Sequence, residues 1–187
     1  MTLLLTWPDT DPTTELLRTE DPAAIEAELK ALGVRFERWD LVPLPDAPTA
    51  EDILAAYAPQ VARVTEAEGY TLVDAMGLVP GAPAETAAAA RAKFLAEHTH
   101  ADDEDRFFAQ GSGVFYLHAD GKVHAVLCEP GDLISVPAST THWFDMGTSP
   151  HFQAIRFFHD TEGWVGEFTG DPLAAAFPDF DTITRSR

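Results

Sequence analysis

Two stretches of the sequence decide the fold and the site: HTHADDEDRFFAQG at residues 98–111 and GDLISVPASTTH at residues 131–142. In the first, His98 and His100 are two positions apart, and in a strand this spacing directs both imidazoles to the same face. A carboxylate follows at Glu104. The second stretch contains a turn, a short strand and a bend, and it ends at His142, which opens another strand. We expect these four side chains to meet as the ligands of one metal ion.

Imidazole and carboxylate ligands together suit iron, nickel, manganese or zinc. Four protein ligands around an octahedral ion leave two positions for substrate or oxygen, so the pattern favours a catalytic site over a structural one. The alternative is four polar side chains on the solvated rim of a barrel, but the combined spacing of the two stretches argues against it. The other histidines, His118, His124, His151 and His159, lie near turns or strand ends and are expected at the surface.

Residues 94–170 have the sequence of a β domain. Aromatic and β-branched residues dominate this segment, in short runs broken by turn sequences at 111–113, 120–121, 130–131 and 147–150. Strands this short and this regularly spaced predict a closed barrel or a sandwich. Cys128, the only cysteine, falls within one of these runs and is expected to be a buried strand residue.

Residues 1–93 alternate helical and extended patterns and are expected to elaborate the barrel. A helix is predicted to begin after Thr49 and to continue through Val64 with a kink at Pro59. The tail, residues 171–187, mixes a short helix with polar residues, and we expect it to be peripheral or frayed. At 187 residues the whole chain fits a single domain.

The composition excludes several classes of partner. Thirty-one acidic residues against 12 basic ones give a formal charge of −19, which repels nucleic acid and anionic membrane surfaces. The N-terminus lacks the basic and apolar regions of a signal peptide, and no apolar run approaches the length of a membrane span. We expect a soluble, cytoplasmic protein, and the high charge favours a monomer.

The two stretches resemble the paired motifs of the cupin superfamily. Residues 131–142 follow the pattern Gly-x5-Pro-x-Ser-x-x-His, which is similar to the second cupin motif, and residues 98–111 resemble the first. The resemblance implies a mainly β fold, a single cupin-type β-barrel (jelly roll) with several α-helices in the N-terminal half. Two positions depart from the usual pattern, with Ser139 in place of glycine and Met146 in place of asparagine. Neither is a ligand, but Ser139 must accept whatever backbone geometry the bend requires.

Longer strings resemble the acireductone dioxygenase family, namely residues 97–100, 106–108, 111–118, 142–147, 154–158 and 162–164. The resemblance implies a metal-dependent dioxygenase of methionine salvage that binds one Fe²⁺ or Ni²⁺ per chain. Its substrates are O2 and the enediolate of 1,2-dihydroxy-3-keto-5-methylthiopentene. In that family iron gives formate and 2-keto-4-methylthiobutyrate, whereas nickel in the same ligand set gives methylthiopropionate, formate and carbon monoxide.

Arg106 is the candidate catalytic residue. It lies two positions after Glu104, so a strand directs it to the metal side, where a guanidinium would favour the doubly ionised substrate. Glu97 and Asp103 immediately precede ligands and so face away; they would orient ligands, assist metal loading or relay conformational change, or else they are solvated acids.

The substrate pocket is expected to include Phe94, Phe144 and Arg156. Phe94 shares strand parity with His98, Phe144 shares it with His142, and Arg156 would form a polar lid. Alternative functions on the same fold are another metal-dependent cupin enzyme, such as a sugar-phosphate isomerase, or a non-catalytic ligand-binding cupin. The isomerase would need basic residues for a phosphate, and the binding protein would lose a metal ligand.

Overall fold

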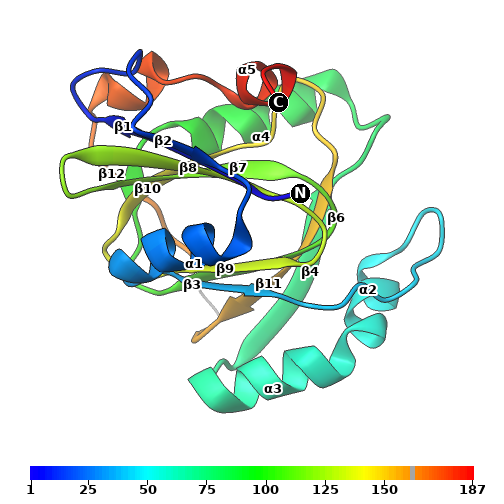
Figure 1. Cartoon of the computed structure of the whole chain (residues 1–187). Coiled ribbons are helices and arrows are strands. Elements are labelled where there is room, and N and C mark those ends of the chain that lie inside the picture. The colour runs from blue at the N-terminus through cyan, green and yellow to red at the C-terminus, as the bar shows by residue number, and fades with distance from the viewer. Residues whose placement is uncertain (161–162) are drawn as a thin grey trace.

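The computed structural model describes residues 1–160 and 163–187, so Glu162 lies outside the described residues. All twelve described strands belong to two antiparallel sheets (Figure 1). The larger sheet has the order β12-β5-β10-β7-β8-β1-β2. In that order its strands span Glu167–Phe168, His98–Thr99, Thr141–Asp145, Gly113–Ala119, Lys122–Cys128, Leu3–Pro8 and Leu17–Thr19. The smaller sheet has the order β3-β9-β6-β11-β4. Its strands span Arg35–Arg38, Asp132–Val136, Glu104–Gly111, Phe152–Phe158 and Leu72–Leu78.

Five α-helices and one 3-10 turn surround the sheets in the part of the chain that the structure describes. From α1 to α5 the helices span Pro22–Ala31, Ala50–Ala56, Ala58–Glu68, Ala84–Leu95 and Phe180–Arg185, and the 3-10 turn spans Pro172–Ala176. In Figure 1, α2 and α3 lie on one side of the molecule and α4 and α5 lie on the other. No helix among the described residues is both long enough and apolar enough to cross a bilayer.

Apolar side chains fill three layers, one between the sheets and one on the outer face of each. Successive residues of a strand point to opposite faces, so Phe108 packs in the central layer while its neighbour Phe107 packs in the outer layer beside α2 and α3. Because both faces are covered, the strands are apolar over continuous runs rather than at alternate positions. The prediction of a mainly β fold is confirmed, and Cys128 is buried as expected.

The prediction of a single kinked helix after Thr49 is wrong, because two helices form. Thr49 and Asp52 make a capping box that starts α2. Tyr57 then separates α2 from α3, and Pro59 lies within the first turn of α3. Proline has no N–H to bond the preceding turn, so it is better placed at the start of a new helix than inside a long one.

The C-terminal segment, residues 171–187, is peripheral, and of the two expected alternatives only fraying is wrong, because the segment is packed. Phe177 is buried and its ring meets that of Trp7 edge to face, with the centroids 5.9 Å apart. The Tyr116 hydroxyl donates to the carbonyl of Pro178 over 2.7 Å, and Ile183 is also buried. The tail therefore covers the outer face of the larger sheet.

His124 on β8 was expected at the surface and is instead buried, 2% exposed. Its Nδ1 lies 3.2 Å from the hydroxyl of Thr6, while Nε2 has no hydrogen-bond partner among the described residues. Burial lowers the pKa of His124, because a protonated ring would place an uncompensated charge in an apolar layer. The sequence missed this because β1 covers the imidazole from 118 residues away.

We predict that His124 makes the fold sensitive to acid. A histidine whose pKa is lowered on folding contributes full stability above its unfolded pKa, about 6.5, and loses that contribution as pH falls below it. The variant His124→Gln can still bond Thr6 but does not titrate. Chemical denaturation between about pH 7.5 and pH 5 should therefore show the free energy of unfolding falling more steeply for the wild type than for the variant. Parallel curves for the two proteins would contradict the prediction.

Candidate metal centre

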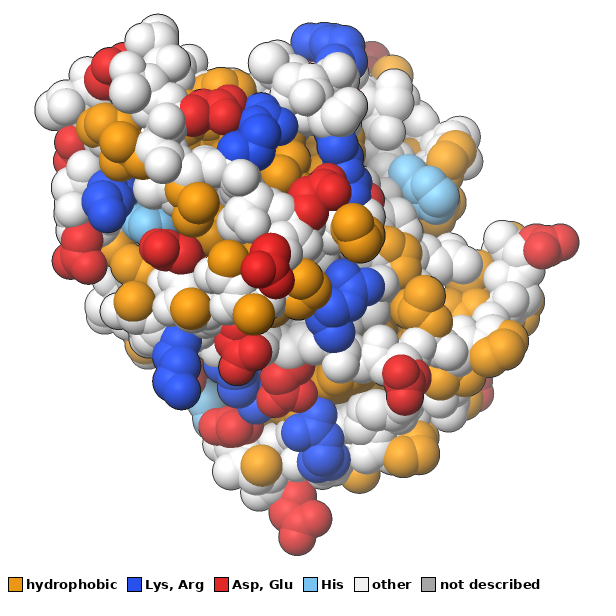
Figure 2. Space-filling view, viewed as in Figure 1, with side chains coloured by type: hydrophobic (Ala, Val, Ile, Leu, Met, Phe, Trp, Pro, Cys, Tyr) orange, Lys and Arg blue, Asp and Glu red, His pale blue; other side chains and the backbone are white. Residues whose placement is uncertain are grey.

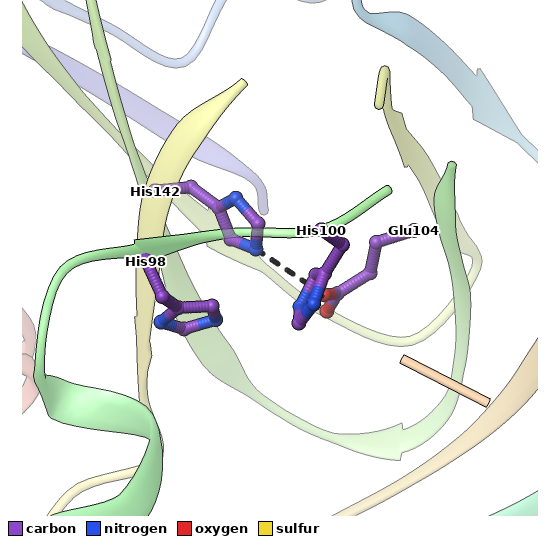
Figure 3. Close-up of side chains that lie close together, drawn as sticks. All are labelled: His98, His100, Glu104 and His142. Carbon is purple, nitrogen blue, oxygen red and sulfur yellow. Dashed lines mark hydrogen bonds and ion pairs between the residues drawn. The ribbon is translucent and has the colours of Figure 1, made fainter. Parts of the chain in front are cut away.

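The four predicted ligands converge from both sheets (Figure 3). His98 on β5 and His142 on β10 are direct partners across the larger sheet, and His100 follows β5. Glu104 is the first residue of β6 in the smaller sheet. One ligand atom from each side chain can be chosen so that all four lie within 4.8 Å of one another, and all four residues are buried. No other group of this kind occurs among residues 1–160 and 163–187.

Backbone carbonyls fix the orientation of all three imidazoles. Nδ1 of His98 lies 2.7 Å from the carbonyl oxygen of Ala96. Nδ1 of His142 lies 2.7 Å from that of Thr140. Nδ1 of His100 lies 2.9 Å from that of Val165. A carbonyl oxygen only accepts, so each Nδ1 carries a proton, and when the ring is neutral its Nε2 retains the lone pair that a metal binds. This is the arrangement in which histidine binds a divalent metal, and the donor set therefore fits one.

Electrostatics keep Glu104 ionised and His98 neutral, as metal binding requires, whereas for His100 burial acts to lower the pKa but the hydrogen bond with Glu104 raises it. Burial acts to raise the pKa of Glu104, but Arg106 and the hydrogen bonds to His100 and His142 outweigh it and hold that pKa well below its usual range. Glu104 Oε2 lies 3.0 Å from His100 Nε2 and 3.2 Å from His142 Nε2. Burial lowers the pKa of His98 to about 4. At neutral pH the group thus offers a carboxylate and a neutral His98 imidazole.

Arg106 lies on the same face of β6 as Glu104, with its Nε 2.8 Å from Glu104 Oε1. Its guanidinium is enclosed by aromatic rings, with Cζ 4.8 Å from the ring centre of Phe144 and 5.2 Å from that of Trp164. Despite its closeness to the carboxylate, Nε is not aligned to donate a hydrogen bond to any described residue. A buried guanidinium with an unsatisfied donor is costly unless a further polar group reaches it.

A cavity of about 620 Å³ adjoins the ligand group, and two of the four ligands, His98 and His100, line it. Arg106, Phe94, Arg156 and Trp164 are also among the lining residues, whereas the predicted pocket residue Phe144 is not. Phe94 lies in α4 rather than in a strand, so the parity argument for it was wrong although it does line the cavity. Phe144 is buried under the Arg106 guanidinium.

Glu97 and Asp103 point away from the ligand atoms and connect neighbouring segments. Glu97 is buried, with Oε2 2.8 Å from His118 Nδ1, and its Oε1 accepts from the Thr169 hydroxyl over 2.9 Å. Asp103 is half-buried, and its carboxylate accepts the backbone N–H of Ala138 over 2.8 Å. Both contacts hold segments next to ligands in place.

Three contributors to the site were absent from the sequence prediction: Asp74, Lys93 and the carbonyl of Val165. Asp74 and Lys93 line the cavity, and the carbonyl orients His100. Asp74 lies 82 residues from Arg156, its partner in the sheet. Only the alternation around Leu72 and Asp74 could have hinted that this carboxylate shares a face with cavity residues.

Ser139 adopts the left-handed conformation, with φ of +64°, where the sequence replaces the usual glycine. Its backbone N–H donates to the carbonyl of His100 over 2.8 Å, which ties the loop before His142 to the first ligand strand. A side chain in this conformation costs about 1 kcal/mol relative to glycine.

We predict that Ser139→Gly stabilises the protein by about 0.5–1 kcal/mol, because it removes strain while keeping the backbone hydrogen bond. Chemical denaturation measures the change. Ser149→Gly is the matched control: Ser149 is exposed in the next loop and has no positive φ, so glycine there should lower stability slightly. If both variants lost stability equally, the strain at Ser139 would be refuted.

Comparison with known proteins agrees with this geometry. The profile of the ARD/ARD′ family matches residues 8–166. The acireductone dioxygenase of Saccharopolyspora erythraea is 58% identical over 191 residues, and the match covers 100% of both chains. That of Frankia alni is 59% identical over 189 residues, and the match covers 99% of this chain and 92% of the relative. A solved structure, "Acireductone dioxygenase from Bacillus anthracis with cadmium ion in active center", is 32% identical with a TM-score of 0.76, covering 90% of this chain and 98% of that one. The chain therefore belongs to the ARD/ARD′ family, the acireductone dioxygenases, which are metal-dependent dioxygenases with a cupin fold.

Proposed function

We propose that this protein cleaves an acireductone with O2, using one Fe²⁺ or Ni²⁺ held by His98, His100, Glu104 and His142. The observation that carries the proposal is the buried group of three imidazoles, each oriented through Nδ1, and one carboxylate. The names of the curated relatives support the choice of substrate, and the cadmium ion in the Bacillus anthracis protein supports a metal in the corresponding centre.

The proposed substrate is 1,2-dihydroxy-3-keto-5-methylthiopentene of methionine salvage. With iron, the products are formate and 2-keto-4-methylthiobutyrate, which together contain all atoms of the substrate and of O2. With nickel, they are methylthiopropionate, formate and carbon monoxide, which balance in the same way. The ligand set suits either metal, so the ion that is loaded selects the products.

A bound divalent ion supplies Lewis-acid charge that two adjacent enediolate oxygens can share. Arg106 stabilises the same negative charge from the side, because its guanidinium lies against Glu104 and has a donor that no described residue satisfies. The aromatic rings around Arg106, including Trp164, exclude water and strengthen this interaction. An ionised enediolate is itself electron-rich, so the proposal requires no general base.

We assign Glu97 and Asp103 positioning roles that act through their neighbours. Glu97 is joined to His118 and Thr169, and it directly precedes the ligand His98. Asp103 directly precedes Glu104 and holds the loop that leads to His142. Each would keep a ligand strand in register while the metal is loaded.

The function is tested by preparing metal-free protein, loading it anaerobically with Fe²⁺ or Ni²⁺, and adding the desthio analogue of the acireductone. We expect both forms to consume O2 and release formate, and only the nickel form to release carbon monoxide. The metal-free protein is the control. Failure of both metal forms to consume O2 would overturn the proposed function.

A second prediction concerns Arg106. Arg106→Gln should lower kcat by about 10²-fold, because one donor to developing negative charge is lost from a site that excludes water. Metal content should stay at one ion per chain, whereas His142→Ala should lose the ion. Arg106→Lys retains the charge and should recover part of kcat, which separates a role in catalysis from a role in folding. Unchanged turnover in Arg106→Gln with a loaded site would refute the role of Arg106.

A further inference from the structure

The cavity concentrates positive charge in a strongly acidic protein. Of the 12 basic residues in the chain, Lys93, Arg106 and Arg156 line this one cavity, while Asp74 is the only acidic residue among its described lining residues. The chain as a whole carries a formal charge of −19. On the face shown in Figure 2, by contrast, acidic and basic side chains are interspersed. A cationic cavity with apolar walls focuses the field on a small anion.

Two of these cations lie side by side. Arg156 on β11 is the direct partner of Arg106 on β6, and both guanidinium groups face the ring of Trp164, with Cζ 5.6 Å and 5.2 Å from its centre. Two neighbouring cations in a partly desolvated site repel each other, and an anion bound next to both would remove that cost.

Asp74 holds Arg156 in a fixed position. Its carboxylate accepts from Nε over 2.8 Å and from Nη2 over 2.5 Å, a bidentate pairing between direct partners on β4 and β11. This pairing does not use Nη1. The guanidinium is thus restrained on one side and retains a donor for a ligand, at a small cost in side-chain entropy on binding.

Lys93 occupies a different position, near the end of α4, where it is exposed. Its Nζ lies 5.7 Å from the ring centre of Phe94, another cavity residue. An exposed cation at the rim contributes little to stability but raises the local concentration of an approaching anion.

We propose that Lys93 and Arg156 determine the specificity of the site for an anionic enediolate: Lys93 attracts the anion at the rim, and Arg156, positioned by Asp74, binds it beside Arg106. This rests on the proposed function and deepens it by naming the charge state that the cavity selects. Neither residue is placed among the groups that hold the metal.

The test is the dependence of kcat/KM on ionic strength, measured with the desthio acireductone and metal-loaded enzyme. For the wild type, kcat/KM should fall as salt is raised from about 0.02 to 0.5 M, because screening shortens the reach of the charges. Lys93→Gln and Arg156→Gln should each lower kcat/KM by about 3- to 10-fold at low salt and flatten its salt dependence. The kcat of Lys93→Gln should stay within about 2-fold, since a charge at the rim affects capture of the anion rather than chemistry.

The matched control is Lys122→Gln, which removes an equal charge from an exposed lysine in β8 that does not line the cavity. It should behave as the wild type. Arg156→Lys is the control for a purely structural effect, because it retains the positive charge. Its kcat/KM should keep the wild-type salt dependence, while KM rises because the bidentate pairing with Asp74 is lost. A salt dependence in Lys93→Gln and Arg156→Gln equal to that of the wild type would overturn the proposal, as would an equal loss in Lys122→Gln.

Anaerobic binding of the desthio acireductone separates this inference from the proposed function. Trp164 lines the cavity, so its fluorescence should report binding without turnover. We expect the dissociation constant to rise by about 3- to 10-fold in each glutamine variant at low salt and to converge with the wild-type value at high salt. If the wild type consumes O2 but the variants bind as tightly as it does, the specificity proposal fails and the proposed function stands. If no form consumes O2, the function itself fails.

Discussion

Three hydrogen bonds from imidazole Nδ1 to backbone carbonyls are the contacts on which the metal centre depends. Because each carbonyl can only accept, Nδ1 is the protonated nitrogen in His98, His100 and His142, and all three Nε2 atoms face a shared point. Two of these carbonyls, of Ala96 and Thr140, lie two residues before the histidine that they orient, so the local strand geometry sets them. The third, of Val165, arrives from a distant segment and closes the site on the side of the cavity.

Charged side chains are concentrated around the ligand group and the adjoining cavity. Glu104 is buried yet remains a carboxylate, because Arg106 and two histidines surround it. Aromatic rings surround the Arg106 guanidinium and exclude water from it. Its electrostatic interactions with neighbouring charges are therefore stronger than they would be in water. The cavity next to it contains further cations, whereas the chain as a whole is acidic. This local excess of cations is the basis of the proposed preference for an anionic substrate.

The outer layers contribute to the site through rigid connections. Asp145, three residues after His142, is buried and pairs in bidentate fashion with Arg91 of α4, over 2.7 Å and 2.9 Å. It also accepts the backbone N–H of Phe180 in the C-terminal tail over 2.9 Å. Helix α4 leads directly into the strand of His98. The tail, α4 and β10 thus share one buried carboxylate, and packing far from the cavity fixes the strands that carry two ligands.

The sequence by itself determined the features that follow from short-range backbone geometry. The alternation of a strand assigned His98 and His100 to one face and placed Arg106 beside Glu104, and the bend required an unusual conformation at Ser139. What only the tertiary structure decided are contacts between distant segments: the carbonyl of Val165 on His100, 65 residues away, and the pairing of Asp74 with Arg156, 82 residues away. Sheet register and the covering of each face set these contacts, and neither leaves a pattern in the local sequence.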